Sequence, residues 1–173
     1  MRIENIREAD AKPFFEAISN ERERLITYFP LTIAETNSLR STKRYIRSLI
    51  NERFNKTMYF YLIKNASNEE VVGMVFIKNI VYRVPKAEIG YFIFEKYEGK
   101  GITTRAIKGL LSICFEKLKL ERVYARIAPT NIGSQKVVLK NGFQLEGRMR
   151  NDFRTADGEL IDVEMYAILK SDQ

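Results

Sequence analysis

The sequence predicts a single α+β (mixed α/β) domain in which helices flank one central sheet. Alternating apolar residues favour seven strands, and apolar residues at helical spacing favour four helices, in the order βααβββαβαββ. A passage from strand through helix to strand over Ala87–Ile127 implies a parallel crossover, which we expect to be right-handed. No linker rich in Pro, Gly or Ser divides the chain, so residues 1–173 are expected to form one domain.

The N-terminal third is expected to hold one strand and two helices. Asp10 is the expected N-cap of the first helix, and Asn37 or Ser38 that of the second. Apolar residues lie on one face of the second helix, with arginines and lysines opposite. The expected bounds are Arg2–Ile6 for the strand and 10–19 and 38–56 for the helices, with no clear pattern over Leu31–Glu35.

The rest of the chain reads as strands interrupted by two helices. Cys114 falls on the apolar stripe of the first of these helices, where a core position is expected. Asp157-Gly158 is a strong hairpin signal between the last two strands. The expected strands are Met58–Lys64, Val71–Val81, Ala87–Phe94, Val123–Ile127, Phe143–Arg154 and Leu160–Leu169, and the expected helices are Ile102–Lys119 and Asn131–Asn141, the latter ended by Gly142.

Composition narrows the possible chemistry. The chain has 29 Lys+Arg, 22 Asp+Glu, a net charge of +7, no histidine and one cysteine. The absence of histidine excludes Ser-His-Asp and Cys-His nucleophiles and His-ligated metals, and a single cysteine excludes a clustered-cysteine zinc site. We therefore expect no metal. The positive charge favours an anionic partner, and the absence of a long apolar run or secretory h-region favours a cytoplasmic protein without a membrane partner.

The segment Tyr97–Ala106 carries the sharpest local signal. A strand ends, Gly99 and Gly101 follow, and a helix begins, so that free N–H groups at the helix N-terminus point toward an anion. The spacing fits neither a Walker A loop nor a dinucleotide fingerprint, because Phe94 and Thr104 stand where glycines are required. The segment is therefore either an anion-binding loop or an ordinary glycine turn before a helix.

Four motifs in order resemble those of the GNAT acyl-CoA-dependent N-acetyltransferases. They resemble most the branch that acetylates N-terminal alanines of ribosomal proteins. The motifs are Ala87-Glu88-Ile89-Gly90-Tyr91, the loop Glu98–Thr104, Asn131-x-x-Ser134 and Asn141-Gly142-Phe143-x-x-Glu146-Gly147. The resemblance covers about Val71–Lys170, whereas residues 1–60 match only in element order. It implies a mostly antiparallel sheet with one parallel, splayed pair, acetyl-CoA as co-substrate and an amine acceptor.

The resemblance also implies cofactor-binding residues. The backbone of Phe92 and Ile93 is expected to bond the pantetheine arm, and Asn131 the same arm from another side. Glu98 and Thr103 depart from the family loop, so the loop is expected to act through its backbone. The expected loop contacts to the pyrophosphate are Gly99, Lys100, Gly101, Ile102, Thr103 and Thr104.

Catalysis of acetyl transfer needs a base, because an amine is mostly an ammonium ion at pH 7. Without histidine a carboxylate is the expected base, and Glu88 lies beside the implied cofactor path. Asp152 is an alternative carboxylate that would receive the substrate ammonium group. Many family members use a tyrosine as the acid for the thiolate, but Val138 occupies that position here. The resemblance instead implies Ser134 as the thiolate donor, set against a purely helix-capping role.

Several functional alternatives stay open at this point. The acceptor is expected to be a protein N-terminal amine, with a polyamine, amino acid or antibiotic as the alternative. A non-catalytic acyl-CoA sensor is a further possibility, and so is a nucleic-acid-binding module, although no RNA-reading signature is present. The aromatic run Tyr59–Tyr61 with Phe76 favours sheet core over a base-stacking platform. The protein is expected to be a monomer or a homodimer.

Overall fold

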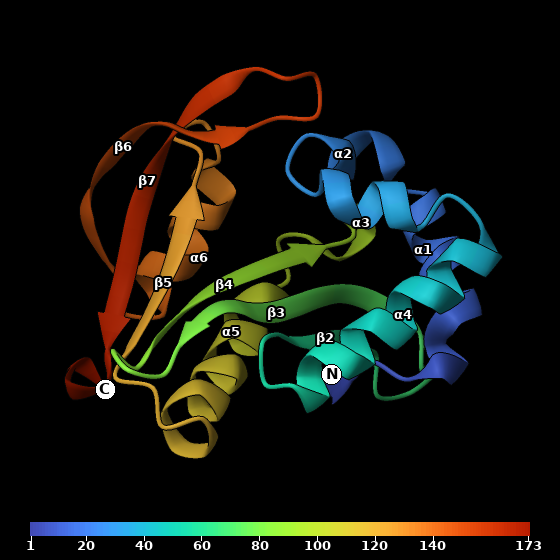
Figure 1. Cartoon of the computed structure of the whole chain (residues 1–173), viewed down its shortest axis with the longest axis horizontal. Coiled ribbons are helices and arrows are strands. Elements are labelled where there is room, and N and C mark those ends of the chain that lie inside the picture. Colours follow the sequence, from blue (N-terminus) through green and yellow to red (C-terminus); the bar gives the residue numbers. More distant parts are fainter.

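The computed structural model describes residues 1–173 as a seven-stranded sheet with helices on both faces (Figure 1). The strand order is β1-β2-β3-β4-β5-β7-β6. The strands are β1 (Arg2–Asn5), β2 (Tyr59–Lys64), β3 (Val71–Val81), β4 (Lys86–Ile93), β5 (Arg122–Ile127), β6 (Gln144–Arg154) and β7 (Leu160–Leu169). The α-helices are α1 (Ala11–Ser19), α2 (Arg22–Ile26), α3 (Pro30–Glu35), α4 (Leu39–Phe54), α5 (Ile102–Ser112) and α6 (Ile132–Lys140). None of them combines the length and apolar character needed to cross a bilayer.

The feature that positions the site is the junction of β4 and β5, which form the only parallel pair. The two strands are paired only where Lys86–Glu88 lies beside Arg122–Tyr124, and beyond Glu88 they separate. Figure 1 shows them diverging from a common base, β4 toward α2 and β5 alongside β7. The parallel crossover through α5 and the splayed pair are therefore as predicted.

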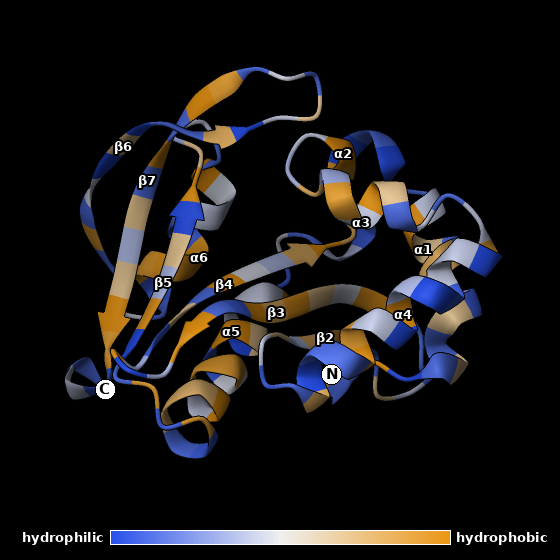
Figure 2. Ribbon diagram, in the orientation of Figure 1, coloured by the Kyte–Doolittle hydropathy of each residue, from blue (hydrophilic) through white to orange (hydrophobic).

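Each face of the sheet has its own core. One hydrophobic cluster, which we call cluster one, includes Ile107 and Leu110 and packs α5 against one face of the sheet. The other, cluster two, includes Phe14 and Ile46 and packs α1–α4 against the β1–β3 half of the opposite face. Apolar ribbon segments accordingly line the inner sides of the helices and the central strands (Figure 2). Cys114 is fully buried in cluster one, and burial raises the pKa of its thiol to about 12. Phe60 and Phe76 stack in cluster two with ring centroids 5.9 Å apart, which confirms the core interpretation of the aromatic run.

The N-terminal third differs most from expectation. It holds four α-helices, whereas two were predicted. The sequence did not indicate α2 and α3, because helices of only 5 and 6 residues show no periodic pattern of apolar residues. Such short helices depend on tertiary packing, here through the buried side chains of Leu25 and Ile33. Ser38 caps α4 by accepting a hydrogen bond from Ser41 N, which settles the choice between Asn37 and Ser38.

Asp10 stands at the N-cap position of α1, as predicted, but its side chain makes no capping hydrogen bond to that helix. Its buried carboxylate accepts hydrogen bonds from Arg7 N at 2.8 Å and from Lys64 Nζ at 2.6 Å. A buried lysine needs a paired anion, and this pairing outweighs a local cap. The helix predicted over Ile102–Lys119 also changes character, because α5 passes into a π-helical turn at Ile113–Lys117.

The β6–β7 hairpin completes the surroundings of the splay. Figure 1 shows its tip extending toward α2 at the side of the sheet that α1–α4 leave uncovered. The rings of Tyr28 and Phe153 meet there with centroids 6.3 Å apart. The hairpin and the α2–α3 region thus face each other across the mouth of the splay.

Candidate active site

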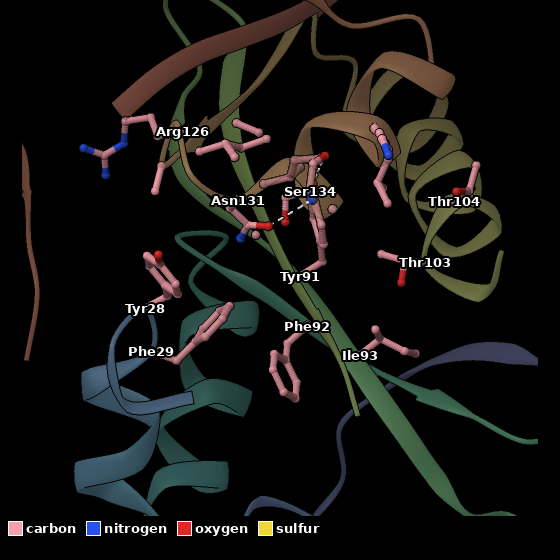
Figure 3. Close-up of a pocket in the computed structure, with 18 of the residues that line it drawn as sticks. Tyr28, Phe29, Tyr91, Phe92, Ile93, Thr103, Thr104, Arg126, Asn131 and Ser134 are labelled. Atoms are coloured by element: carbon pink, nitrogen blue, oxygen red, sulfur yellow. Dashed lines mark hydrogen bonds between the residues drawn. The ribbon is translucent and has the colours of Figure 1, made fainter. Parts of the chain in front are cut away.

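A cavity of about 700 Å³ opens where β4 and β5 separate (Figure 3). This volume suits a small-molecule site. Its walls come from β4, the N-termini of α5 and α6, the end of β5, the α2–α3 region and the β6–β7 hairpin. Of the residues predicted for the site, those that line the cavity are Glu88, Phe92, Ile93, Gly99, Gly101, Ile102, Thr103, Thr104, Asn131 and Ser134.

The free edge of β4 supplies backbone groups to the cavity. Phe94 N donates to Val72 O at 3.0 Å, and successive residues of an antiparallel strand alternate between facing their partner and facing away. The backbone of Phe92 therefore faces β3, whereas the backbones of Tyr91 and Ile93 face the splay. Phe92 contributes its side chain to the cavity instead (Figure 3). Sequence reasoning missed Tyr91, although two-residue alternation from Ile93 would have found it.

The loop before α5 exposes backbone N–H groups. Gly99 and Gly101 have φ of +70° and +66°, a left-handed conformation that favours glycine. No side chain caps α5, so its first N–H groups remain free at the positive end of the helix dipole. The side chain of Lys100 does not line the cavity, because its Nζ donates to Lys96 O at 2.7 Å and lies 5.4 Å from the Tyr97 ring centroid. The loop thus offers backbone, not the Lys100 ammonium group, to a ligand.

The start of α6 presents two polar groups. Asn131 Oδ1 accepts a hydrogen bond from Ser134 N at 3.0 Å and so caps the helix (Figure 3). Neither the Asn131 amide nitrogen nor the Ser134 hydroxyl makes a hydrogen bond within the protein, although both residues line the cavity. The capping role and a ligand-binding role are therefore compatible at both residues.

Tyr91 fixes α6 against β4. Its partly buried hydroxyl donates to Ser134 O at 3.0 Å, and burial raises the pKa of Tyr91. The phenol stays protonated at neutral pH and acts as a donor. It holds the backbone of Ser134 beside the cavity.

The two predicted carboxylates are joined by one arginine. Glu88 is 5% exposed; its Oε2 accepts from Asn79 Nδ2 at 2.7 Å, and its Oε1 accepts from Arg126 Nε at 3.2 Å. Lys78 Nζ lies 3.4 Å from the same Oε1. Arg126 Nη1 donates to Asp152 Oδ2 at 2.8 Å. Sequence reasoning missed Arg126, a polar position that alternates with buried residues along β5.

Asp152 does not line the main cavity. It borders an adjacent hollow of about 260 Å³ on the same side of the sheet. Glu88 and Arg126 line both hollows and so form their shared wall. The structure therefore places Glu88 at the splay, and Asp152 in the adjacent hollow on the other side of Arg126.

Comparison with known proteins decides the family. Residues 1–144 match the family model described as the acetyltransferase (GNAT) domain. The chain belongs to the GNAT acetyltransferase family. This membership confirms the resemblance read from the four motifs, and the family's enzyme class and acetyl-CoA co-substrate agree with those expected from the sequence.

Curated relatives support the assignment. The chain is 36% identical over 115 residues to the Probable N-acetyltransferase YjcK of Bacillus subtilis, a match that covers 66% of this chain and 63% of that protein. It is 31% identical over 99 residues to the ribosomal-protein-serine acetyltransferase of Escherichia coli, covering 57% of this chain and 55% of that protein. The matched part thus spans about 60% of the length of these GNAT relatives.

Solved structures share the GNAT fold. The ribosomal-protein-S5-alanine acetyltransferase of Vibrio fischeri superposes with a TM-score of 0.90 at 22% identity, covering 98% of this chain and 93% of that one. RimJ of Mycobacterium smegmatis, in complex with CoA-disulfide, gives a TM-score of 0.89 at 24% identity, covering 98% and 82%. A spermidine N-acetyltransferase of Vibrio cholerae gives 0.77 at 19% identity, covering 99% and 96%. The fold class is therefore confirmed, while the fold alone does not decide the acceptor.

Proposed function

We propose that this GNAT protein transfers the acetyl group of acetyl-CoA to the N-terminal amine of a polypeptide, by direct attack in a ternary complex. One observation carries the proposal. The splay of β4 and β5 brings an uncapped helix N-terminus, free strand backbone and an open sheet face into one cavity.

The residues present fit acetyl-CoA. The cradle of Gly99 and Gly101 with the free N–H groups of α5 suits a pyrophosphate, which favours helix N-termini. The backbones of Tyr91 and Ile93 and the amide nitrogen of Asn131 suit the amide groups of a pantetheine arm. These donors and acceptors line one continuous cavity that leads from the loop to Ser134.

The reaction follows from these positions. The acceptor amine loses a proton to Glu88, directly or through a water, and its nitrogen attacks the thioester carbonyl carbon. A backbone N–H at the splay suits the negative charge that develops on the carbonyl oxygen. When the carbon–sulfur bond breaks, the Ser134 hydroxyl donates a hydrogen bond to the departing thiolate, and the proton that the attacking nitrogen loses as it becomes an amide balances the thiol of free CoA. The buried Cys114 takes no part, because it does not line the cavity.

Two features support a polypeptide acceptor over a polyamine. A second hollow lies beyond the wall formed by Glu88 and Arg126 and is bordered by Met149 and Met165, which gives an acceptor longer than a small amine room to extend. The carboxylates of Glu88 and Asp152 are already paired with Lys78 and Arg126, so this part of the site carries no excess negative charge that would attract a polycation. The name of the Escherichia coli relative, which acts on a ribosomal protein, agrees with this choice.

The test is an acetyl-transfer assay with a panel of peptides and small amines, following release of free CoA. We expect turnover with peptides that carry a free N-terminus, and strong loss of turnover in Glu88→Gln and Ser134→Ala. Glu116→Gln is a matched control, because Glu116 is exposed and lies outside the cavity. CoA binding is measured in parallel, to separate loss of chemistry from loss of folding.

Three outcomes would contradict the proposal. Tight CoA binding without turnover of any amine would indicate a sensor. A higher kcat/KM for a polyamine or an amino acid than for every peptide would show that the small amine, and not a polypeptide, is the acceptor. Salt-dependent RNA binding without CoA affinity would remove the enzyme assignment altogether.

A further inference from the structure

The cofactor loop contains a carboxylate where an anion is expected to bind. Glu98 opens the loop and lines the cavity together with Gly99 and Gly101. An unpaired negative charge there would repel phosphate groups. The structure supplies a partner from a distant part of the chain, because Arg24 Nη2 donates to Glu98 Oε1 at 2.5 Å.

Arg24 makes three further contacts that hold it in place. Its Nη1 donates to Glu21 Oε2 at 2.6 Å, and its guanidinium lies 5.0 Å from the ring centroid of Phe92. Its Nη2 also lies 3.5 Å from Ile93 O, on the edge of β4 that faces the splay. The guanidinium is thus fixed by two carboxylates and one aromatic face.

Glu21 extends this connection to the segment between β4 and α5. Its Oε1 accepts a hydrogen bond from Glu95 N at 2.9 Å. Two bridges therefore join α2 to this segment, one at its start through Glu21 and one at its end through the Arg24–Glu98 pair. The same helix leads into Tyr28 and Phe29, which line the acceptor side of the cavity.

We propose that Arg24 is a positioning residue of the cofactor site, which neutralises Glu98 and fixes the loop so that an anionic CoA phosphate can bind beside it. The proposal rests on the proposed function only in taking Gly99–Thr104 as the phosphate site. Arg24 also lines the cavity, but its proposed role is through Glu98 and not through direct contact with the cofactor. The side chains of Arg24 and Glu98 are 35% and 53% exposed, so the charge of Glu98 lies within reach of solvent ions and of a ligand.

A double-mutant cycle with CoA as the probe tests this role. The dissociation constant is measured by calorimetry at low salt for the wild type, Arg24→Gln, Glu98→Gln and the double variant. We expect Arg24→Gln to bind CoA about five- to tenfold more weakly, as one uncompensated charge a few ångströms from a phosphate would cause. Glu98→Gln is expected to bind as tightly as the wild type or more tightly, and the double variant to match Glu98→Gln.

Controls separate position from net charge and from folding. Arg40→Gln removes one positive charge from an exposed residue that makes no ion pair, and it is expected to leave CoA affinity within twofold. The weakening in Arg24→Gln should shrink at about 1 M salt, where the Debye length is about 3 Å. Thermal melts check that each variant is folded.

The cycle has two results that would overturn the inference. Arg24→Gln could weaken CoA binding by the same factor with and without Glu98, which would mean that Arg24 contacts the phosphates directly. Alternatively, Arg24→Gln could leave the affinity unchanged. Failure of the wild type itself to bind CoA would contradict the proposed function, and it is thereby distinguished from failure of the Arg24 role.

Discussion

Replacement of Ser134 by alanine is the sharpest test of the chemical step. Only the backbone N–H of Ser134 takes part in the cap of α6, and its hydroxyl makes no hydrogen bond within the protein. Ser134→Ala should therefore change the free energy of unfolding by less than about 0.5 kcal/mol. A hydrogen bond to a charged group contributes about 1.5–3 kcal/mol, so loss of the donor to the thiolate should slow acetyl transfer roughly 10- to 150-fold.

Asn131→Ala is the matched variant, because it removes the cap and leaves the hydroxyl. It should cost about 0.5–2 kcal/mol of stability and lower Tm by a few degrees. The assay is single-turnover acetyl transfer at saturating acetyl-CoA, combined with thermal melts and CoA binding. A transfer rate for Ser134→Ala within twofold of the wild type would refute the reasoning, as would a rate loss that simply follows a drop in Tm.

Three further predictions concern the frame of the site. Gly90→Ala should lose about 1–3 kcal/mol in urea unfolding, because the added Cβ would meet ring atoms of Phe76 at 2.2–3.0 Å; an unchanged midpoint would contradict the packing argument. Lys64→Ala should lose about 3–5 kcal/mol because it strands the buried Asp10 carboxylate, and adding Asp10→Ala should restore part of the loss. Cys114 should resist iodoacetamide at pH 8 in the folded protein, since burial raises its pKa to about 12. Its contribution to stability should be complete below the unfolded pKa of about 8.5 and decline between there and pH 12, and rapid native labelling would count against this.

The long helices and strands could be predicted from the sequence, because the periodic pattern of apolar residues that indicates them lies within each segment. The apolar stripe of α5 and the alternation of β5 each repeat over enough residues to specify element and face. The helices α2 and α3 were not readable, because one or two turns carry no period and their stability comes from packing on the sheet. Asp10 shows the same limit at a single residue, since a partner 54 positions away replaced the expected cap.

Some features of the candidate site could likewise be predicted from local patterns, and others depend on the tertiary structure. Gly101 before a helix and Asn131 three residues before Ser134 are local patterns, and in the structure Gly101 directly precedes α5 and Asn131 caps α6. The direction of the Lys100 side chain, the register that selects Tyr91 over Phe92, and the arginine between Glu88 and Asp152 depend on neighbours from other strands and loops.

The sequence by itself determined the order of the main elements and the glycine loop before α5, and its four motifs indicated the family by resemblance. The elements and the loop follow from spacing between residues that are close in the chain, where glycine conformation, capping and hydrophobic period act directly. Only the tertiary structure decided which charges meet. Arg24 and Glu98 are 74 residues apart and Glu88 and Arg126 are 38 apart, and no local pattern encodes such pairs. Folding brings these side chains together, because α2 packs beside the loop before α5 and β4 pairs with β5 at the base of the splay. The resulting ion pairs set the electrostatics of the site.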